Sequence, residues 1–540
     1  MEIPLFGIGL QGKSPVVSSQ SRVNCYYQFE RDADRTLVSI HGTPGLKEII
    51  NFGNQPIRGG LAVGSTLYVV HRNKLFSLNN AFIRTELGTL NTDRGIIQCA
   101  NNGLELLIVD GVNGYIYNYE HGSFFQIKVF STGNADADNA GKLEDSGADF
   151  ITDGVLPGMA IHNVTDGTRA IIEAVDSATV LSLSADIFAN GEEYEVGESD
   201  FPNGATTCGF VDNYFLVELG SRFFISRPLF GMSWDGTEFS SAEQAPDGIV
   251  RLFVDHQDVI LFGTETTEYF GNNQGVDFPF VPIQGTSDEW GLAAKWSVAK
   301  FDNSYMYLAQ NTMGEVMLVR SSGYAPTPIN DQAFHSIIND EDFGVVTDAR
   351  AFAYLLGGHP MYQITFPSAG RSFLYDRSTD VISEMQSYNM TRHRADLHFN
   401  FLQKNYVTDY EQGIIFQLDT KTYKDGDLPI VRKLVSRHDH NKQHTEIIVD
   451  RLEVLMETGV GLSTGQGSDP KMMLRVSKDL GRSFGVQMLE SVGKMGEYQE
   501  PRVLFEDLGS ARDFIYELSY SEPTKFVITG VNRNKRDAQV

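Results

Sequence analysis

The fold class is decided by a stretch that reads Gly209-Phe210-Val211-Asp212-Asn213-Tyr214-Phe215-Leu216-Val217 and that recurs twice in similar form, at residues 253–262 and 297–308. Each copy is an apolar strand, a short polar turn and a second apolar strand rich in β-branched and aromatic residues, which is typical of a β-hairpin. The expected turn tips, Asn213, Asp258 and Asn303, are spaced by 45 residues. One hairpin in each period of about 40–45 residues indicates the four-stranded blades of a β-propeller.

Four further hairpins are predicted at residues 61–70, 97–109, 352–364 and 397–407. Hairpins occur in any all-β protein, but in a protein without repeats we would expect their spacing along the chain to be unequal. The spacing fails once, over the 110 residues between Gly103 and Asn213, which we interpret as one period carrying an insertion. The sequence therefore predicts an all-β chain with a propeller of six to eight blades, an inserted small β domain and a C-terminal β-rich region.

The expected domain boundaries follow from this pattern. Residues 1–57 form an N-terminal arm and strands, 58–130 the first blades, and 131–199 the inserted small β domain. Residues 200–430 hold the remaining blades, and 431–540 form the C-terminal region. Helical periodicity is scarce, and residues 292–300 and 331–340 are expected to form a turn or two at most.

Composition excludes several classes of protein. The chain has 70 acidic and 43 basic residues in 540, for a formal net charge of −27, so high-affinity binding to DNA phosphates is not expected. Cys25, Cys99 and Cys208 are odd in number and far apart, which predicts neither a disulfide framework nor a zinc site. The N-terminus lacks a secretory signal pattern, and no apolar run reaches the ~20 residues of a membrane span. We expect a soluble protein.

A phosphate-loop pattern, GxxxxGK[ST], occurs at Gly7 to Ser14 and includes Gly12 and Lys13. That loop binds phosphate only between a strand and the N-terminus of a helix. Here six residues precede Gly7, and a β-prone run follows Ser14. We therefore expect a flexible glycine-rich arm and no nucleotide cofactor.

Several motifs resemble one protein family. They are Arg22-Val23-Asn24-Cys25-Tyr26-Tyr27, His41-Gly42-Thr43-Pro44-Gly45-Leu46, and a run at residues 456–470 that contains Met-Glu-Thr-Gly-Val-Gly and Gly-Gln-Gly-Ser-Asp-Pro. In this order they resemble the packaged-DNA stabilisation proteins of short-tailed (podovirus) bacteriophages, also called tail hub or nozzle proteins. The resemblance covers most of the chain outside the insertion.

This resemblance implies a structural virion protein and not an enzyme. It implies a homo-oligomer, by resemblance a hexamer, that joins the portal-adaptor ring to the distal tail, retains packaged DNA and forms the channel for its ejection. The implied partners are the portal-adaptor ring protein, a tail fibre or tailspike, and a tail needle or plug protein, with double-stranded DNA passing through the lumen without sequence specificity. The expected location is the virion tail, after assembly in the host cytoplasm.

The insertion begins with a small, acidic segment at residues 134–149, which we expect to be a mobile linker. Asp136 and Asp138 lie in it and could ligate calcium, but the EF-hand pattern is incomplete, and a solvated linker is the simpler interpretation. The following residues alternate as short strands and predict a small β-barrel or sandwich. The insertion departs from shorter members of the family, so the resemblance implies nothing about its role.

Two motifs in the C-terminal region could carry chemistry. His438, His440 and His444 form an HxHxxxH cluster, and two imidazoles two residues apart on a strand share a face, so a metal site stays open although no metal is predicted. Ser477, Asp479, Gly481, Ser483 and Phe484 match the Asp-box pattern S-x-D-x-G-x-[ST]-[WF]. Asp and Gly shape a hairpin turn in such a box while the aromatic ring packs beneath.

The Asp-box also raises an alternative function, a sialidase-like propeller glycoside hydrolase acting on host surface glycans. That chemistry needs paired carboxylates, or a tyrosine with a carboxylate and an arginine cluster, at the central end of the propeller. The Asp-box occurs in one clear copy and is a structural turn in sialidases too. We therefore predict no catalytic, cofactor-binding or metal residues.

Overall fold

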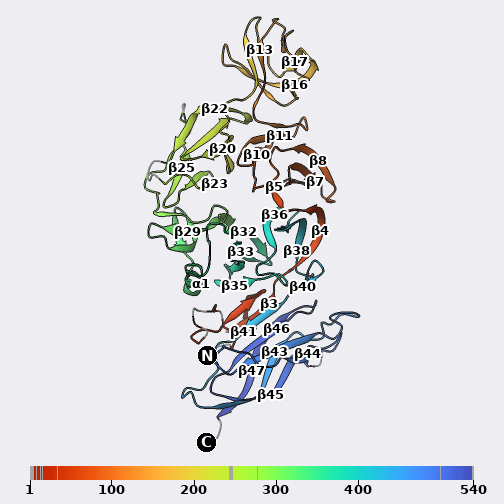
Figure 1. Ribbon diagram of the computed structural model, residues 1–540, viewed down its shortest axis with the longest axis vertical. Helices are drawn as coiled ribbons and strands as arrows, with labels where there is room; N and C mark the ends of the chain where they lie inside the picture. Colours follow the sequence, from red (N-terminus) through yellow and green to blue (C-terminus); the bar gives the residue numbers. More distant parts are fainter. Residues whose placement is uncertain are drawn as a thin grey trace.

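The computed structural model describes residues 5–7, 9–11, 14, 16–32, 35–242, 247–275, 278–498 and 500–537. Figure 1 shows three bodies along the long axis: the insertion at one end, the propeller in the middle and the C-terminal region at the other end. The described residues contain no helix that is long and apolar enough to cross a membrane. The one α-helix among them is α1 (Gln332–Ile338), whose N-cap Asp331 accepts a hydrogen bond from the Phe334 amide.

Seven sheets form the blades of the propeller within the described residues, a number inside the predicted range of six to eight. The innermost strands contact their neighbours around the ring, and the last, in blade 7, contacts the first, in blade 1. Blade 1 consists of β5 (Ile57–Val63), β6 (Thr66–His71), β7 (Lys74–Leu78) and β8 (Arg84–Thr89), and blade 2 of β9 (Gln98–Asn101), β10 (Glu105–Val109), β11 (Gly114–Asn118) and β12 (Phe124–Gln126). Blade 3 consists of β19 (Cys208–Val211), β20 (Tyr214–Leu219), β21 (Arg222–Arg227) and β22 (Phe230–Ser241), and blade 4 of β23 (Arg251–Asp255), β24 (Asp258–Phe262), β25 (Thr267–Asn272) and β26 (Phe280–Pro282).

The remaining three blades follow the same order, from the axis outward. In blade 5, β27 (Trp290–Leu292) and β28 (Ala299–Phe301) both pair with β29 (Ser304–Asn311), and β30 (Val316–Ser322) and β31 (Ala325–Pro328) follow. Blade 6 consists of β32 (Arg350–Leu356), β33 (His359–Phe366), β34 (Arg371–Asp376) and β35 (Val381–Met385). Blade 7 consists of β36 (Ala395–Phe401), β37 (Lys404–Asp409), β38 (Gln412–Asp419) and β4 (Gly45–Asn54), with β39 (Lys424–Asp425) and β40 (Leu428–Pro429) beyond β4.

All seven predicted hairpins are present as the two inner strands of the blades. The Asp212-Asn213 loop has φ of 48° and 74°, which is the left-handed pair that Asp and Asn tolerate in a two-residue hairpin. The prediction that Asp258 forms a tip was wrong by one position. Asp258 begins β24 and pairs with Asp255, so the loop residues are His256 and Gln257. Identical aspartates flank this loop, and the sequence alone does not show which residues turn.

The propeller is closed by a strand from the N-terminal part of the chain. β4 pairs antiparallel with β38, from Gly45 opposite Asp419 to Asn54 opposite Gln412. The prediction that all of residues 1–57 precede the first blade is wrong, because β4 is the outer strand of blade 7. Because its partner lies more than 350 residues away in the chain, no local pattern identifies this pairing.

The insertion is a six-stranded antiparallel sheet, the predicted small β domain. Its strand order is β13-β18-β15-β16-β17-β14, and its core includes the buried Phe150, Ile172 and Tyr194. Phe201 packs edge-on against Trp234 of blade 3, with ring centroids 5.2 Å apart, at the base of the insertion. Residues 129–199 carry 14 acidic and two basic residues. The strands are β13 (Val129–Asn134), β14 (Lys142–Glu144), β15 (Ala160–Asn163), β16 (Arg169–Ser177), β17 (Val180–Leu183) and β18 (Glu193–Gly197).

The C-terminal region is a sandwich of two sheets that also takes in the N-terminal strands. Buried side chains of both sheets, Val454 and Phe505 from one and Leu474 and Tyr516 from the other, belong to one core. One sheet is β2 (Cys25–Asp32), β3 (Arg35–Gly42), β47 (Val527–Asp537), β42 (Ile447–Met456) and β45 (Arg502–Ala511); the other is β1 (Ser21–Val23), β41 (Arg432–Val435), β46 (Ile515–Tyr520), β43 (Lys471–Ser477) and β44 (Met488–Ser491).

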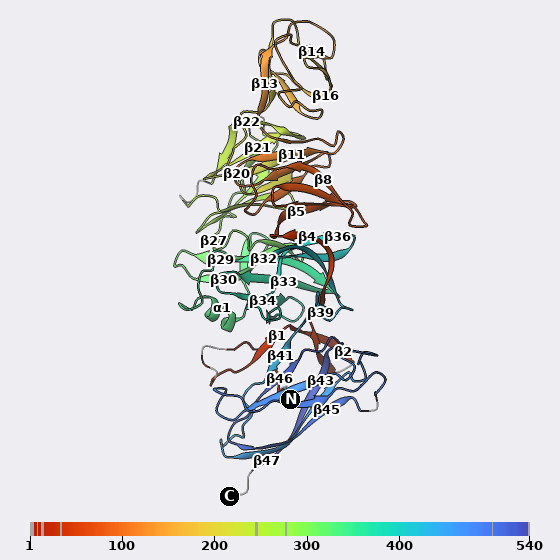
Figure 2. The ribbon, with the colours of Figure 1, turned by 45° about the vertical axis from the view of Figure 1, so that its right-hand side comes forward.

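The short strand β1 joins the sandwich to the propeller. It pairs parallel with β35 of blade 6 and antiparallel with β41, so that blade 6 and one sandwich sheet form a continuous nine-stranded sheet. Figure 2 shows β1 at this boundary, above β41 and β46. Arg22 of β1 is 1% exposed and donates hydrogen bonds to the carbonyl oxygens of Ile382 in blade 6 and of Gly7 and Gly9 in the N-terminal arm.

Asn24 directly follows β1, and both the nitrogen and the oxygen of its side-chain amide form hydrogen bonds at the same boundary. Its amide nitrogen donates to the carbonyl oxygens of Gln386 at 2.7 Å and Val431 at 2.9 Å, and its amide oxygen accepts from the Gln386 N–H at 2.9 Å. It is 1% exposed and has φ of 56°, a conformation that asparagine adopts at lower cost than most residues. Asn24 therefore fixes blade 6 and the start of β41 relative to each other.

We predict that Asn24→Ala lowers the free energy of unfolding by about 2–4 kcal/mol, because three hydrogen bonds are lost and buried backbone groups are left without partners. The measurement is chemical denaturation of the purified protein. The matched control is Asn389→Ala, since Asn389 is exposed and has φ of 55°. Asn389→Ala should lower the free energy of unfolding by only about 1 kcal/mol, the cost of placing alanine in the left-handed backbone conformation. Equal losses in the two variants would contradict the role assigned to Asn24.

Candidate functional site

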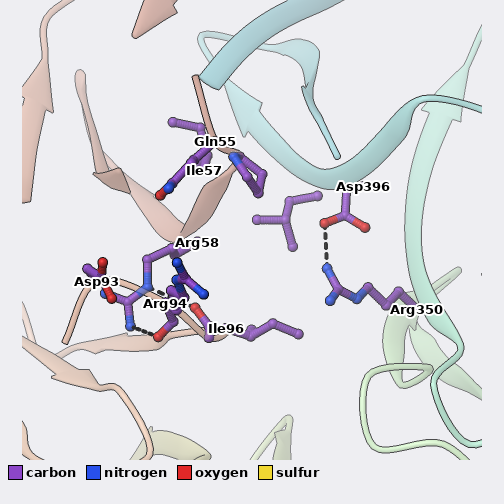
Figure 3. A pocket seen from close by; sticks show the side chains of 11 residues that line it. Gln55, Ile57, Arg58, Asp93, Arg94, Ile96, Arg350 and Asp396 are labelled. Carbon is purple, nitrogen blue, oxygen red and sulfur yellow. Dashed lines mark hydrogen bonds and ion pairs between the residues drawn. The ribbon is translucent and has the colours of Figure 1, made fainter. Parts of the chain in front are cut away.

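The candidate site is a cavity of about 250 Å³ beside the propeller axis. It lies at the end of the propeller axis where inner strands begin, such as β5 at Ile57 and β32 at Arg350. Residues from blades that are far apart in the sequence therefore meet there. Figure 3 shows Arg58, Arg94, Arg350 and Asp396 around the cavity. Its lining consists of Gln55, Pro56, Ile57, Arg58, Asp93, Arg94, Gly95, Ile96, Arg350, Asp396 and Leu397.

Arg58 is fully occupied by structural hydrogen bonds. Its guanidinium donates to the carbonyl oxygens of Arg72, Thr92, Arg94 and Gly95 at 2.6–2.8 Å and to the Thr92 hydroxyl at 2.9 Å. Four of these five bonds hold the segment that leads into β9. Arg58 therefore ties blade 1 to the entrance of blade 2, and its charge is not directed at a ligand.

The opposite wall is an ion pair between blades 6 and 7. Arg350 Nη1 lies 2.6 Å from Asp396 Oδ2, and the Asp396 side chain is 4% exposed. Arg350 and Asp396 also line an adjoining cavity of about 210 Å³, together with the buried Arg251. Arg251 donates to the Lys295 carbonyl oxygen at 2.8 Å, and burial lowers its pKa to about 10, so it stays cationic at neutral pH.

This arrangement does not provide the acid and base of a glycoside hydrolase. The carboxylates in the described lining of the first cavity are Asp93, which is exposed, and Asp396, which Arg350 neutralises. Burial raises the pKa of Glu105 to about 7, but Glu105 accepts a hydrogen bond from the Gly231 amide at 2.7 Å and lies outside this lining. The contacts at the axis are those of a structural support between blades.

The predicted Asp-box lies in the connection between β43 and β44, which pair as an antiparallel hairpin. Asp479 accepts hydrogen bonds from the Ser477 hydroxyl at 2.8 Å and from the Ser483 amide at 2.9 Å, and the Ser477 hydroxyl accepts from the Gly481 amide at 3.0 Å. Phe484 is half-buried, with the Arg475 guanidinium carbon 5.4 Å from its ring centroid. These contacts close a turn on an exposed loop, far in sequence from the axis residues.

The three histidines of the HxHxxxH cluster have separate contacts. His438 Nδ1 lies 2.9 Å from Asp513 Oδ1, whereas the rings of His440 and His444 stack with centroids 4.0 Å apart. Over the part of the chain that the structure describes, no group of three or more His, Cys, Asp or Glu side chains is placed to hold a metal ion.

The glycine-rich arm is only partly described, and Gly12 and Lys13 lie outside the described residues. Within the described part, the carbonyl oxygens of Gly7 and Gly9 accept hydrogen bonds from Arg22, and the Gly9 amide donates to the Gln20 side chain at 3.3 Å. A phosphate loop directs such amides at the phosphates. Here the described groups bind the protein's own side chains.

All three cysteines are free thiols. Burial raises the pKa of Cys25 and of Cys99 to about 12, and burial also raises the pKa of Cys208. Cys25 and Cys208 are buried and Cys99 is half-buried, and neutral thiols of this kind are unreactive.

Sequence reasoning found the Asp-box but missed the residues at the axis and at β1. Arg58, Arg350 and Asp396 come together only through the ring of blades, and a single sequence carries no signal for that. Arg22 and Asn24 stood inside a motif of the resembled family, but their role depends on partners more than 350 residues away.

Hydrogen bonds from Ser483, and then from Ser477, lower the pKa of Asp479 to about 2 from an ordinary value of 3.8. The folded state therefore favours the carboxylate, and its stabilising effect is present above about pH 4 and is lost as the pH falls from about 4 to 2. We predict that Asp479→Ala lowers the melting temperature at pH 7 and that the difference from the wild type narrows toward pH 2.5.

The control for this comparison is Asp138→Ala, a change at another exposed aspartate. Scanning calorimetry of the three proteins across the pH range measures the effect. A difference between the wild type and Asp479→Ala that is equal at pH 7 and pH 2.5 would contradict the role given to the carboxylate.

Comparison with solved structures finds chains of low similarity, among them the following two. The computationally designed Ika8 protein matches with a TM-score of 0.33 and 10% identity, over 69% of this chain and 99% of its own. The N-terminal domain of Nup159 matches with a TM-score of 0.36 and 8% identity, over 74% of this chain and 99% of its own. Such scores carry no argument about fold or function. Comparison with curated protein sequences finds no significant match.

Two family models match the chain in the order of its bodies. Residues 163–423 match the β-propeller model of bacteriophage P22 Gp10, and residues 433–534 match the β-sandwich model of the same protein. Together they cover about two thirds of the chain and include most of the propeller and nearly all of the C-terminal region. The predicted resemblance to packaged-DNA stabilisation proteins is thereby confirmed, and the chain belongs to the family of bacteriophage P22 Gp10, a phage structural protein.

Proposed function

We propose that the chain is a subunit of the tail hub, or nozzle, of a short-tailed phage. In this proposal several copies form a ring, by family resemblance a hexamer, between the portal-adaptor ring and the distal tail, where a tail fibre or tailspike and a needle or plug protein attach. The observation that carries the proposal is the match of both the propeller and the sandwich to one phage structural protein.

The geometry of the chain supports a load-bearing role over a catalytic one. The propeller is closed by β4, and β1 continues its blade 6 into the sandwich. Interior polar groups at the axis are used in contacts between blades, as Arg58 and the Arg350–Asp396 pair show. A ring under the portal needs subunits that keep their shape when DNA moves, and these contacts provide that rigidity.

An exposed edge of the sandwich suits contact with a neighbouring subunit. β44 is the last strand of its sheet and pairs only with β43 among the described strands. Four large apolar side chains in and after the Asp-box hairpin are exposed: Val486 by 89%, Leu489 by 55%, Met495 by 59% and Tyr498 by 67%. Exposed apolar groups on an open sheet edge mark a site of protein contact. We propose that this edge docks on a different surface of the next copy, because a head-to-tail contact closes a ring.

We predict that the wild-type protein, or the tail that contains it, shows a ring whose mass is a multiple of the 60.0 kDa subunit, and that Val486→Asp with Leu489→Asp shifts it toward monomer. Two buried carboxylates at the contact would oppose association. The measurement is mass photometry at several protein concentrations.

The matched control is Met313→Asp, since Met313 is 91% exposed on the propeller, away from the sandwich. It should assemble like the wild type. A wild-type protein that is monomeric both alone and in mature tails would contradict the ring, and equal assembly of all three proteins would contradict the assigned edge.

The net charge of −27 per subunit suggests how the proposed channel handles DNA. A basic lumen would bind phosphates and release counterions, which would hold the duplex on the wall. An acidic lumen repels the duplex from all sides, and retention then comes from steric closure by a loop or a plug protein. We propose a net-acidic channel of this kind.

We predict that changing several carboxylates that face the channel in the assembled ring to lysine slows DNA ejection, most at low ionic strength, where screening is weak. Ejection is timed in vitro at two salt concentrations. The control changes an equal number of carboxylates on the outer wall. Unchanged or faster ejection at low salt would show that the charge does not act on the DNA.

A further inference from the structure

A third cavity, of about 270 Å³, lies where the propeller meets the sandwich. It is lined by Tyr26 of β2, by residues 41–44 at the end of β3 and directly after it, by Thr420 and Tyr423 after β38, by Arg432 at the start of β41, and by residues 525–527, which lead into β47. Figure 2 shows β39, β1, β41 and β2 at this boundary. The cavity therefore touches both bodies of the chain.

Arg432 is the unusual member of this lining. It is 1% exposed, and its Nε, Nη1 and Nη2 atoms have no hydrogen-bond partner among the described residues. The guanidinium carbon lies 6.0 Å from the ring centroid of Tyr423. Gly42 makes room for it, because a Cβ at Gly42 would collide with Nε of Arg432. A buried guanidinium with all its nitrogen atoms unpaired is costly, so it requires an acceptor.

No carboxylate of the described chain supplies that acceptor. Asp425 is buried and acts electrostatically on Arg432, but it forms no ion pair with it and instead accepts a hydrogen bond from the Ser387 hydroxyl at 3.0 Å. The described lining contains no Asp or Glu. The positive charge of Arg432 is thus left without a contact partner at the wall of a space that could hold roughly nine waters.

The other groups around the cavity also favour a negative occupant. Lys525 lies at the rim with its side chain 48% exposed, and its Nζ is 2.7 Å from Glu457 Oε2. Thr420 and Tyr423 bring hydroxyl groups that can donate hydrogen bonds, whereas the Thr43 hydroxyl already donates to the Asn24 carbonyl oxygen at 3.3 Å. Guanidinium nitrogen atoms match the spacing of phosphate and carboxylate oxygen atoms and bind them in pairs.

We propose that this cavity binds a small oxyanion, a phosphate or carboxylate group, through Arg432 with Lys525 at the rim. The bound group accepts hydrogen bonds from the Arg432 guanidinium and contacts residues of both the propeller and the sandwich. It thereby stabilises the junction that β1 and Asn24 form between the two bodies. The site lies apart from the propeller axis and does not depend on the role in the tail.

The test titrates purified wild-type protein with sodium phosphate and, separately, with sodium acetate, against sodium chloride at equal ionic strength. Melting temperature and isothermal calorimetry are the measurements. A ligand that binds only the folded protein raises the melting temperature in a saturable way, so at least one of the two oxyanions should do so. Arg432→Met, which keeps an unbranched apolar stem and removes the charge, should abolish the shift.

A second pair of variants covers the case that Arg432→Met does not fold. Lys525→Gln should weaken oxyanion binding several-fold, and Lys471→Gln, at an exposed lysine outside the cavity, should leave it unchanged. A response to phosphate alone or to acetate alone identifies the oxyanion. If neither phosphate nor acetate gave a saturable response, or if Arg432→Met responded equally, the proposal would be overturned. The cavity would then contain only water.

Discussion

Backbone hydrogen bonds of the three-residue strand β1 make blade 6 of the propeller and one sheet of the sandwich a single sheet. The other parts of the chain depend on this junction. Arg22 and Asn24, on and directly after β1, bind carbonyl groups of blade 6 and of the segment that enters β41. After β2 and β3, β4 closes the propeller as the outer strand of blade 7. The N-terminal segment thus belongs to both bodies, and neither is complete without it.

Local sequence was sufficient to predict the blades but not their closure. Each inner hairpin is formed by residues close in the chain, and turns such as Asp212-Asn213 have a chemistry that a pattern can show. β4 and β1 pair with strands more than 350 residues away, and their own sequences look like those of other strands. The error at Asp258 has a different cause, because two aspartates flank a two-residue loop and either could have been part of it.

The candidate sites also divide into those formed by residues close in the sequence, which could be predicted, and those formed by distant residues, which could not. The Asp-box was predictable because Ser477, Asp479 and Ser483 interact within one turn. The ion pair of Arg350 with Asp396 and the unpaired guanidinium of Arg432 arise only when separate blades and sheets come together. Most charged groups at the axis are used in contacts between blades, which agrees with a protein that bears load in a virion. The acidic insertion is attached through Phe201 and Trp234, and nothing in its sequence indicated what it contacts.

The central claim is that β1 makes the propeller and the sandwich one rigid unit. Hydrogen exchange of the native protein, read at the amides of residues 21–24, tests it most directly. The account predicts that these amides exchange as slowly as those of β35 and β41, because opening any one strand requires opening the continuous sheet. Exchange at residues 21–24 within seconds, while β35 and β41 stay protected, would show that the two bodies are held together by other contacts.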